Sequence, residues 1–358
     1  MKKIVSVLCA VLALAACDNQ KSDKPVVKIG VSLPLSGNMQ SVAASSRKAV
    51  QTAIKDANAD TDNHYHYDIV IEDDAMQPQQ AQLIANKFTT LDKVNAFVSF
   101  TSSQGRIFSS FADKYETLHF NCAFGNEGVL TSKYNFQMFT QPNTEVKAVA
   151  DFLKNTNKKS VTLLFVNRVT SEELVKALVP LLKKYNIKYD TEYFNQTDRD
   201  FSILVERVKK QNNDAIVLYG LEPTISIIGK SLYANGLIDK VVMPDVIQFV
   251  SDINLYNGAY NIGSAVANEE FKKHINLKKE NPAFSNYMYD IVSFIVSAYE
   301  NTYDKDANVN NSRVADYILS QKNWNGVAGN YNIANNGAIE TDVVLYKVEN
   351  GKLVQVME

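Results

Sequence analysis

The sequence predicts an α/β protein of two lobes, each built on a mainly parallel sheet flanked by helices. Short apolar runs alternate with segments whose apolar residues recur every three or four positions, from residue 26 to residue 123. The same alternation restarts near Gln141. The length of 358 residues, with 46% hydrophobic side chains, suits two domains of ordinary size. Strands that alternate with helices are typical of parallel sheets joined by right-handed crossovers.

The first unit is predicted to hold four strands separated by three helices. Its opening strand carries little charge and is broken by Pro34 and Gly37, and the helix that follows has apolar residues at helical spacing. The elements in chain order are strand Val26–Leu33, helix Val42–Ala59, strand Tyr67–Ile71, helix Gln79–Thr90, strand Asn95–Phe100, helix Arg106–Tyr115 and strand Leu118–Ala123.

The second unit repeats this order, and the chain then ends in one long helix and several strands. The predicted elements are strand Ser160–Val166, helix Ser171–Tyr185, strand Lys188–Phe194, helix Phe201–Gln211, strand Asp214–Tyr219, helix Thr224–Asn235, strand Val241–Met243, helix Phe284–Tyr303, and strands Gly329–Ile333, Val343–Val348 and Leu353–Val356.

A hydroxyl-rich turn links the third strand to the third helix. Thr101, Ser102 and Ser103 follow Phe100 without a spacer. Ligands of open α/β sheets bind outside the carboxyl ends of the strands, and a helix amino terminus suits an anion such as a carboxylate. We therefore expect a ligand contact here; the alternative is that a serine only caps the helix.

The amino terminus is a targeting segment. Lys2 and Lys3 precede a short apolar run, and Leu14-Ala-Ala-Cys17 resembles a bacterial lipobox. This pattern predicts a signal peptide over residues 1–16 and a lipid on Cys17. Residues 17–25 are polar and are expected to be a lipidated tether, so that the protein is anchored on the periplasmic side of the bacterial cell membrane.

Composition excludes several classes of function. The chain has 37 basic and 39 acidic residues, so no basic excess is available for nucleic acid. Cys122 is the one cysteine left beside the signal peptide and Cys17, and we expect it to be a small buried hydrophobe. The four histidines form no metal-ligand motif, and no catalytic or phosphate-binding motif is present. We expect no enzyme activity, no cofactor and no metal.

Motifs spread along the chain resemble those of the type I periplasmic solute-binding proteins, most closely the branched-chain amino-acid-binding branch. Each motif is weak alone, but the order and spacing are fairly specific. They are Ile29-Gly-Val-Ser-Leu-Pro-Leu-Ser-Gly37, Ala53-Ile-Lys-Asp-Ala-Asn-Ala59, Asp73-Asp74, Ser102-Ser103, Phe139-Thr-Gln-Pro142, Asp200-Phe-Ser202, Tyr219-Gly220 and Tyr289-Asp290.

The resemblance implies two lobes joined by three crossovers, with a small-molecule ligand, expected to be an amino acid, held between them. It implies lobe 1 over residues 26–142 and 270–328, lobe 2 over residues 143–269 and 329–358, and an ABC permease as the membrane partner. Ser102 and Ser103 would donate to the ligand carboxylate, and Asp245 would face its ammonium. The full set of implied ligand-binding residues is Ser36, Ser102, Ser103, Phe124, Asn126, Leu221 and Asp245.

The sequence also departs from the family pattern. Leu221 stands where the family has a tyrosine that closes over the ligand, and Val42 stands where an aromatic residue lines the side-chain pocket. These departures leave the ligand's side chain open. They also leave an alternative function, an envelope interaction protein that uses the same fold on a protein partner, as penicillin-binding-protein activators do.

Overall fold

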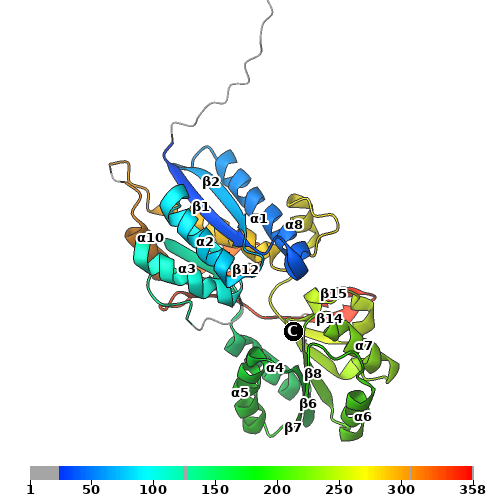
Figure 1. The fold of residues 1–358 in the computed structure, drawn as a ribbon. Helices are drawn as coiled ribbons and strands as arrows, with labels where there is room; N and C mark the ends of the chain where they lie inside the picture. The colour runs from blue at the N-terminus through cyan, green and yellow to red at the C-terminus, as the bar shows by residue number, and fades with distance from the viewer. Residues whose placement is uncertain (1–23, 124–127, 307, 357–358) are drawn as a thin grey trace, which may run out of the picture.

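The computed structural model describes residues 24–123, 128–306 and 308–356. It consists of two lobes, each with a central sheet between layers of helices (Figure 1). The predicted two-lobed α/β architecture is confirmed. In the described part of the chain, no helix is both long and apolar enough to cross a lipid bilayer.

The first lobe is built on a sheet with strand order β11-β12-β13-β5-β4-β3-β1-β2. Strands β2, β1, β3, β4, β5 and β13 are parallel neighbours, whereas β11 and β12 add an antiparallel edge. The strands are β1 (Val26–Leu33), β2 (His66–Asp73), β3 (Ala96–Phe100), β4 (Leu118–Cys122), β5 (Asn135–Met138), β11 (Asn323–Gly326), β12 (Gly329–Ile333) and β13 (Ala338–Thr341). The helices are α1 (Gln40–Ala59), α2 (Pro78–Lys87), α3 (Ser102–Tyr115), α8 (Glu269–His274), α9 (Ser285–Asn301) and α10 (Asn311–Ser320).

The second lobe is built on a sheet with strand order β15-β14-β10-β9-β8-β6-β7. Strands β7, β6, β8, β9 and β10 are parallel, and β14 and β15 complete the sheet in antiparallel register. The strands are β6 (Ser160–Val166), β7 (Lys188–Phe194), β8 (Ala215–Tyr219), β9 (Val241–Pro244), β10 (Tyr260–Gly263), β14 (Val344–Glu349) and β15 (Lys352–Gln355). The helices are α4 (Pro142–Asn155), α5 (Val169–Lys184), α6 (Ser202–Gln211) and α7 (Thr224–Ala234).

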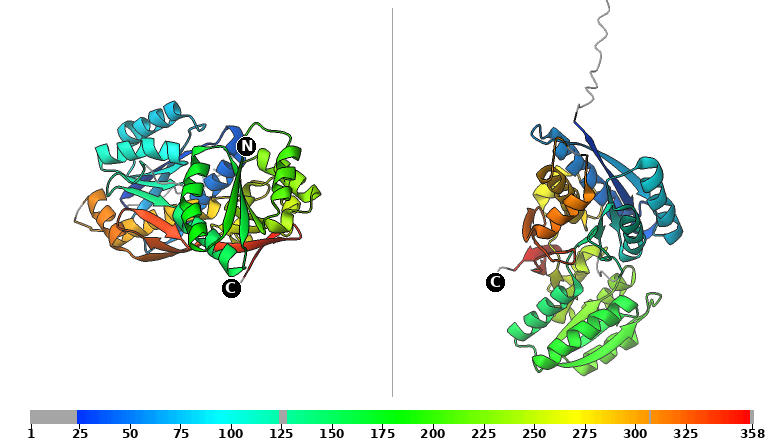
Figure 2. Two further views of the ribbon diagram at one scale, coloured as in Figure 1. Left: turned by 90° about the horizontal axis from the view of Figure 1, so that it is seen from below. Right: turned by 90° about the vertical axis from the view of Figure 1, so that its left-hand side faces the viewer.

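The chain crosses between the sheets after β5, after β10 and between β13 and β14. The last crossing corrects the expected lobe boundary at residue 328, because β12 and β13 still belong to the first sheet. Ala338 and Ile339 of β13 pair with Gln137 and Met138 of β5. Figure 2 shows that the orange and red segments near the C-terminus contribute to both lobes.

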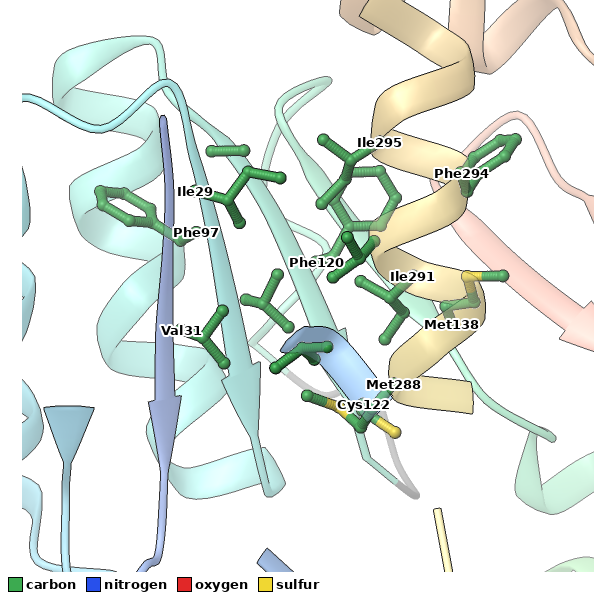
Figure 3. Close-up of a cluster of buried hydrophobic side chains, with 14 of the residues drawn as sticks. Ile29, Val31, Phe97, Phe120, Cys122, Met138, Met288, Ile291, Phe294 and Ile295 are labelled. Atoms are coloured by element: carbon green, nitrogen blue, oxygen red, sulfur yellow. The ribbon is translucent and has the colours of Figure 1, made fainter. Parts of the chain in front are cut away.

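One half of the first-lobe core lies between the sheet and α9, and the other half lies between the sheet and helices α2 and α3. Side chains from β1, β3 and β4, among them Ile29, Val31 and Phe120, face Ile291 and Ile295 of α9 (Figure 3). Nearly continuous apolar runs are expected in strands covered on both faces, which explains why the parallel strands were readable from the sequence. Cys122 is buried in this core, as the sequence predicted.

Candidate ligand site at the junction of the lobes

The first-lobe part of the candidate site is the turn between β3 and α3. A single residue, Thr101, separates Phe100 from Ser102, and its backbone has φ 73° and ψ 150°. A β-branched residue rarely adopts a positive φ, so the surrounding structure must hold this turn. The Thr101 carbonyl accepts hydrogen bonds from Asn121 Nδ2 at 3.0 Å and from the Gly105 backbone at 3.0 Å. These bonds fix the amino end of α3 at the carboxyl end of the sheet.

Gly105 makes room for this arrangement. A Cβ atom at position 105 would lie 2.7 Å from the side chain of Asn121, which holds the Thr101 carbonyl. We expect Gly105→Ala to lower the free energy of unfolding by about 1–3 kcal/mol, since overpacking outweighs the better helix propensity of alanine. Urea denaturation measures this loss. Ser110→Ala, on the exposed side of α3, is the control and should change stability by less than about 0.5 kcal/mol. An equal effect of both variants would contradict the role given to Gly105.

The hydroxyl groups predicted to meet an anion lie at this helix start. Ser103 is exposed and Ser102 is partly buried. The hydroxyls of Thr101 and Ser103 both donate to the side-chain oxygen of Gln104. Gln104 is fully buried, and its amide nitrogen has no hydrogen-bond partner within the described residues. The free amide N–H and the helix amino terminus suit an anionic group.

Asp245 forms the second-lobe part of the candidate site. It follows β9 directly, has φ 38° and is 8% exposed. Ser264 Oγ donates to its two carboxylate oxygens at 2.7 and 2.6 Å, and Gln248 Nε2 donates at 2.6 Å. Burial raises the pKa of Asp245 to about 7, against the opposing effect of these hydrogen bonds. Gly263 is needed beside it, because a Cβ there would lie 2.6 Å from Asp245 Cβ.

Asp245 also lies within electrostatic reach of the first lobe. Burial and then the charge of Asp245 raise the pKa values of Tyr287 on α9 and of the Cys122 thiol at the end of β4. Tyr287 reaches toward the second lobe as well, because its hydroxyl accepts from the backbone of Ala265, just after β10. The carboxyl ends of β4 and β9, from different sheets, therefore meet at the junction.

The other predicted site residues lie in loops or outside the described residues. Ser36 is exposed after β1 and donates to Asp73, which also accepts from the Leu35 backbone at 2.9 Å. Asp73 thus holds the turn that follows β1. Leu221 lies between β8 and α7 with a partly buried side chain. The predictions for Phe124, Asn126 and Cys17 fall outside the described residues.

Two buried residues near this junction were missed by sequence reasoning, Gln104 and Glu145. Glu145 belongs to the first turn of α4 and is 1% exposed. A signal for Glu145 exists in the sequence, because Val149 and Leu153 follow it at intervals of four on the buried face of α4. Gln104 directly follows the serine pair, and nothing in the local sequence distinguishes it from an exposed helix residue.

Comparisons with known proteins identify this architecture. A family model described as periplasmic binding protein matches residues 26–352. The leucine-specific-binding protein of Salmonella typhimurium is 23% identical over 265 residues, which cover 72% of this chain and 71% of that protein.

Solved structures share the fold. A periplasmic ligand-binding protein of a branched-chain amino acid ABC transporter from Burkholderia xenovorans superposes with a TM-score of 0.83 at 18% identity, covering 92% of this chain and 94% of that one. The substrate-binding protein of a branched-chain amino acid transporter from Streptococcus pneumoniae, in complex with isoleucine, gives a TM-score of 0.76 at 20% identity, covering 92% and 100%.

These matches confirm the resemblance that the motifs indicated. The family and its relatives are periplasmic substrate-binding proteins, not enzymes. The chain belongs to the periplasmic binding protein family, as a solute-binding protein of the type I, branched-chain amino-acid-binding kind.

Proposed function

We propose that this protein is the lipid-anchored solute-binding component of an ABC importer and that it holds an amino acid or a similar small zwitterion between its lobes. The observation that carries the proposal is the pairing of two unlike surfaces at the junction. The first lobe offers N–H and O–H donors at the start of α3, and the second lobe offers the buried carboxylate of Asp245. A desolvated zwitterion needs charge-assisted partners of opposite kinds at its two ends.

In this proposal, Ser102 and Ser103 donate to the ligand carboxylate and Asp245 accepts from the ammonium. The Ser103 hydroxyl then turns from Gln104 Oε1 to the ligand. Ser36, Phe124, Asn126 and Leu221 complete the contacts. Because the two ends of the ligand are held by different lobes, bound ligand favours their approach, and a membrane permease reads the closed form. The family relationship and the solved relative with isoleucine support a small polar ligand.

Thermal-shift screening of the protein against the natural amino acids and short peptides tests the proposal. A ligand that binds only the native state stabilises it by mass action, by about 2.7 kcal/mol at a hundredfold excess over Kd. Small-angle scattering on the same complex should show a smaller radius of gyration. If no compound shifts the melting temperature, the envelope interaction protein becomes the better account, for which the absence of a tyrosine at Leu221 is the supporting observation.

The lipid anchor gives a separate prediction. We expect Cys17→Ala to accumulate as an unprocessed precursor and to lose palmitate labelling, because the modified sulfur is absent. Labelling with radioactive palmitate, followed by membrane fractionation, measures this. Cys122→Ala is the matched control and should label like the wild type, since Cys122 is buried in the core. Palmitate on the Cys17→Ala protein would show that the anchor lies elsewhere.

A further inference from the structure

His119 is a buried titratable residue that the proposed ligand contacts do not use. It lies on β4, is fully buried, and its ring packs against Phe108 of α3 with the ring centres 6.0 Å apart. Both ring nitrogens are hydrogen-bonded. Nε2 lies 2.8 Å from Ser99 Oγ on β3, and Nδ1 lies 2.9 Å from Asn135 Oδ1 on β5. A buried ring with both nitrogens satisfied is held in one orientation.

The hydrogen bonds of His119 continue to the turn that opens α3. Asn121, which is also on β4, donates through Nδ2 to Ser99 Oγ at 2.8 Å and to the Thr101 carbonyl at 3.0 Å. Thr101 has the positive φ of 73°, and the predicted ligand serines follow it directly. A chain of hydrogen bonds therefore runs from His119 through Ser99 and Asn121 to the ligand turn, and we call these three residues the His119 relay.

The direction of each bond in the His119 relay is fixed from the Thr101 end. A carbonyl oxygen can only accept, so the atom of Asn121 that faces it must be the amide nitrogen. The second hydrogen of this nitrogen goes to Ser99 Oγ, and the Ser99 hydroxyl therefore donates onward to His119 Nε2. Because Nε2 accepts, it carries no proton, and the proton of the neutral ring lies on Nδ1.

The contacts on the other side of the ring require the same tautomer independently. Asn135 Nδ2 donates at 2.6 Å to Asp113 Oδ1, a carboxylate oxygen on α3 that can only accept. Asn135 Oδ1 therefore faces His119 and accepts the hydrogen of Nδ1. Ser109 Oγ, 3.3 Å from Nδ1, donates to the Val129 carbonyl, which leaves Nδ1 as the donor. Burial lowers the pKa of His119 to about 4, so the ring is neutral between about pH 5 and pH 8, as both sides require.

We propose that His119 is a positioning residue for ligand binding, which acts through Ser99 and Asn121 to hold the Thr101 turn and the serine donors that follow it. The inference rests on the proposed function and adds a residue that does not itself touch the ligand. A β-branched residue rarely keeps a positive φ unless its surroundings hold it there. Without the ring nitrogen, the Ser99 hydroxyl loses its acceptor, and Asn121 can turn away from the Thr101 carbonyl.

Hydrogen exchange tests the relay without any ligand. The full-length protein in mild detergent is exchanged, and the peptide over residues 101–109 is followed by mass spectrometry. The Gly105 amide reports on the turn, because it donates to the Thr101 carbonyl at 3.0 Å. We expect His119→Leu and Ser99→Ala each to speed exchange in this peptide by about tenfold, as the loss of one buried hydrogen bond does. The double variant should exchange no faster than His119→Leu, because both changes interrupt the same relay.

Tyr299→Phe is the matched control, because it removes a buried hydroxyl near the opposite end of β3. Tyr299 Oη lies 3.1 Å from the Asn95 carbonyl, directly before β3, and 2.7 Å from Asn311 Oδ1. The control should lower the melting temperature and leave exchange of residues 101–109 within about twofold of the wild type. Ser99→Ala carries the test if His119→Leu does not fold. Unchanged exchange of this peptide in the relay variants would overturn the inference, as would equal acceleration in Tyr299→Phe.

Calorimetry with L-leucine and L-isoleucine tests the link from the turn to the ligand. If either probe binds, His119→Leu and Ser99→Ala should raise its Kd by about tenfold, whereas Tyr299→Phe should not change it. Faster exchange of the turn with no loss of affinity would overturn the inference and leave the proposed function standing. If no natural amino acid bound the wild type, the proposed function would fall, and the exchange result would still decide whether His119 holds the turn.

Discussion

Asp290→Ala is expected to lower the free energy of unfolding by about 3–5 kcal/mol. Asp290 lies on α9, is 1% exposed and accepts three hydrogen bonds. The backbone N–H groups of Val327 and Ala328 donate at 2.8 and 2.9 Å, and the Tyr331 hydroxyl donates at 2.8 Å. Alanine leaves these donors without a partner and opens a cavity. The variant should also loosen the hairpin of β11 and β12, which these bonds tie to the helix.

Urea denaturation followed by circular dichroism measures the change. The control is Asp316→Ala, in the same lobe, because Asp316 forms an exposed ion pair with Lys133. An exposed pair of this kind contributes roughly 0–1 kcal/mol. A loss below about 1 kcal/mol in Asp290→Ala would show that water replaces the carboxylate without penalty and that the hairpin is held by its other contacts.

The parallel part of each sheet could be predicted from the sequence for a simple physical reason. Strands covered by helices on both faces must be apolar throughout, and the helices that cover them repeat apolar residues at three and four. The strands that were missed are the four-residue strands β5, β10, β11 and β13. In β5, Asn135 and Gln137 are buried although they are polar, so the run does not show the apolar character of the other strands.

The position of the last crossing could not be predicted for a related reason. β12 and β14 are both short strands that follow the long helix α9. The residues in and around them do not show which sheet each strand joins. Parallel pairing of β13 with β5 assigns β12 and β13 to the first lobe. The paired strands β5 and β13 lie two hundred residues apart in sequence, as Met138 and Ile339 show. Only the folded chain brings the two strands together.

Candidate site residues could be proposed from the sequence because strand ends can be read from it. Ser102 and Ser103 became candidates because they follow a buried strand directly, and Asp245 became one because it matches a family motif after a strand. Burial of a polar residue within a helix is harder to predict. Val149 and Leu153 place Glu145 on the apolar face of α4, but the sequence alone does not show that this face packs on β9 and β10 and buries the carboxyl group.

Asp245→Asn is expected to weaken binding of the cognate amino acid by about 2–5 kcal/mol, mostly as faster dissociation. The substitution keeps the shape and removes the charge that we propose faces the ligand ammonium. Ser102→Ala removes one hydrogen bond to a charged group and should cost about 1.5–3 kcal/mol. Calorimetry with the amino acid that gives the largest thermal shift measures both losses.

The same contact makes the affinity depend on pH. The pKa of Asp245 in the free protein is about 7, so its carboxyl group is protonated below that pH and must release a proton before it can pair with a cation. The association constant should therefore rise about tenfold per pH unit up to about pH 7 and then level off. In Asp245→Asn this dependence should disappear.

Other titratable groups surround Asp245, and their contributions to the pH dependence must be distinguished from that of Asp245. Burial raises the pKa values of a thiol and several phenols from the neighbouring elements, which keeps them neutral between about pH 5 and pH 8. They are Cys122 on β4, Tyr219 on β8, Tyr287 on α9 and Tyr346 on β14. Glu145 on α4 is the remaining acid, with a pKa raised by burial and by Asp245. Repeating the titration in Glu145→Gln isolates the step that belongs to Asp245.

Glu222→Gln is the control that removes an acidic charge from the second lobe without removing Asp245. Glu222 belongs to the second lobe, but its carboxylate already accepts from the backbone of Ser251 at 2.6 Å and from the hydroxyl of Ser251 at 2.8 Å. Because these donors already occupy its carboxylate, Glu222 stabilises the loop around it. Its neutral variant should therefore bind the ligand like the wild type. If Asp245→Asn instead bound normally while Glu222→Gln abolished binding, the ammonium would be held by the loop before α7. Leu221 and Glu222, rather than the residue after β9, would then face the ligand.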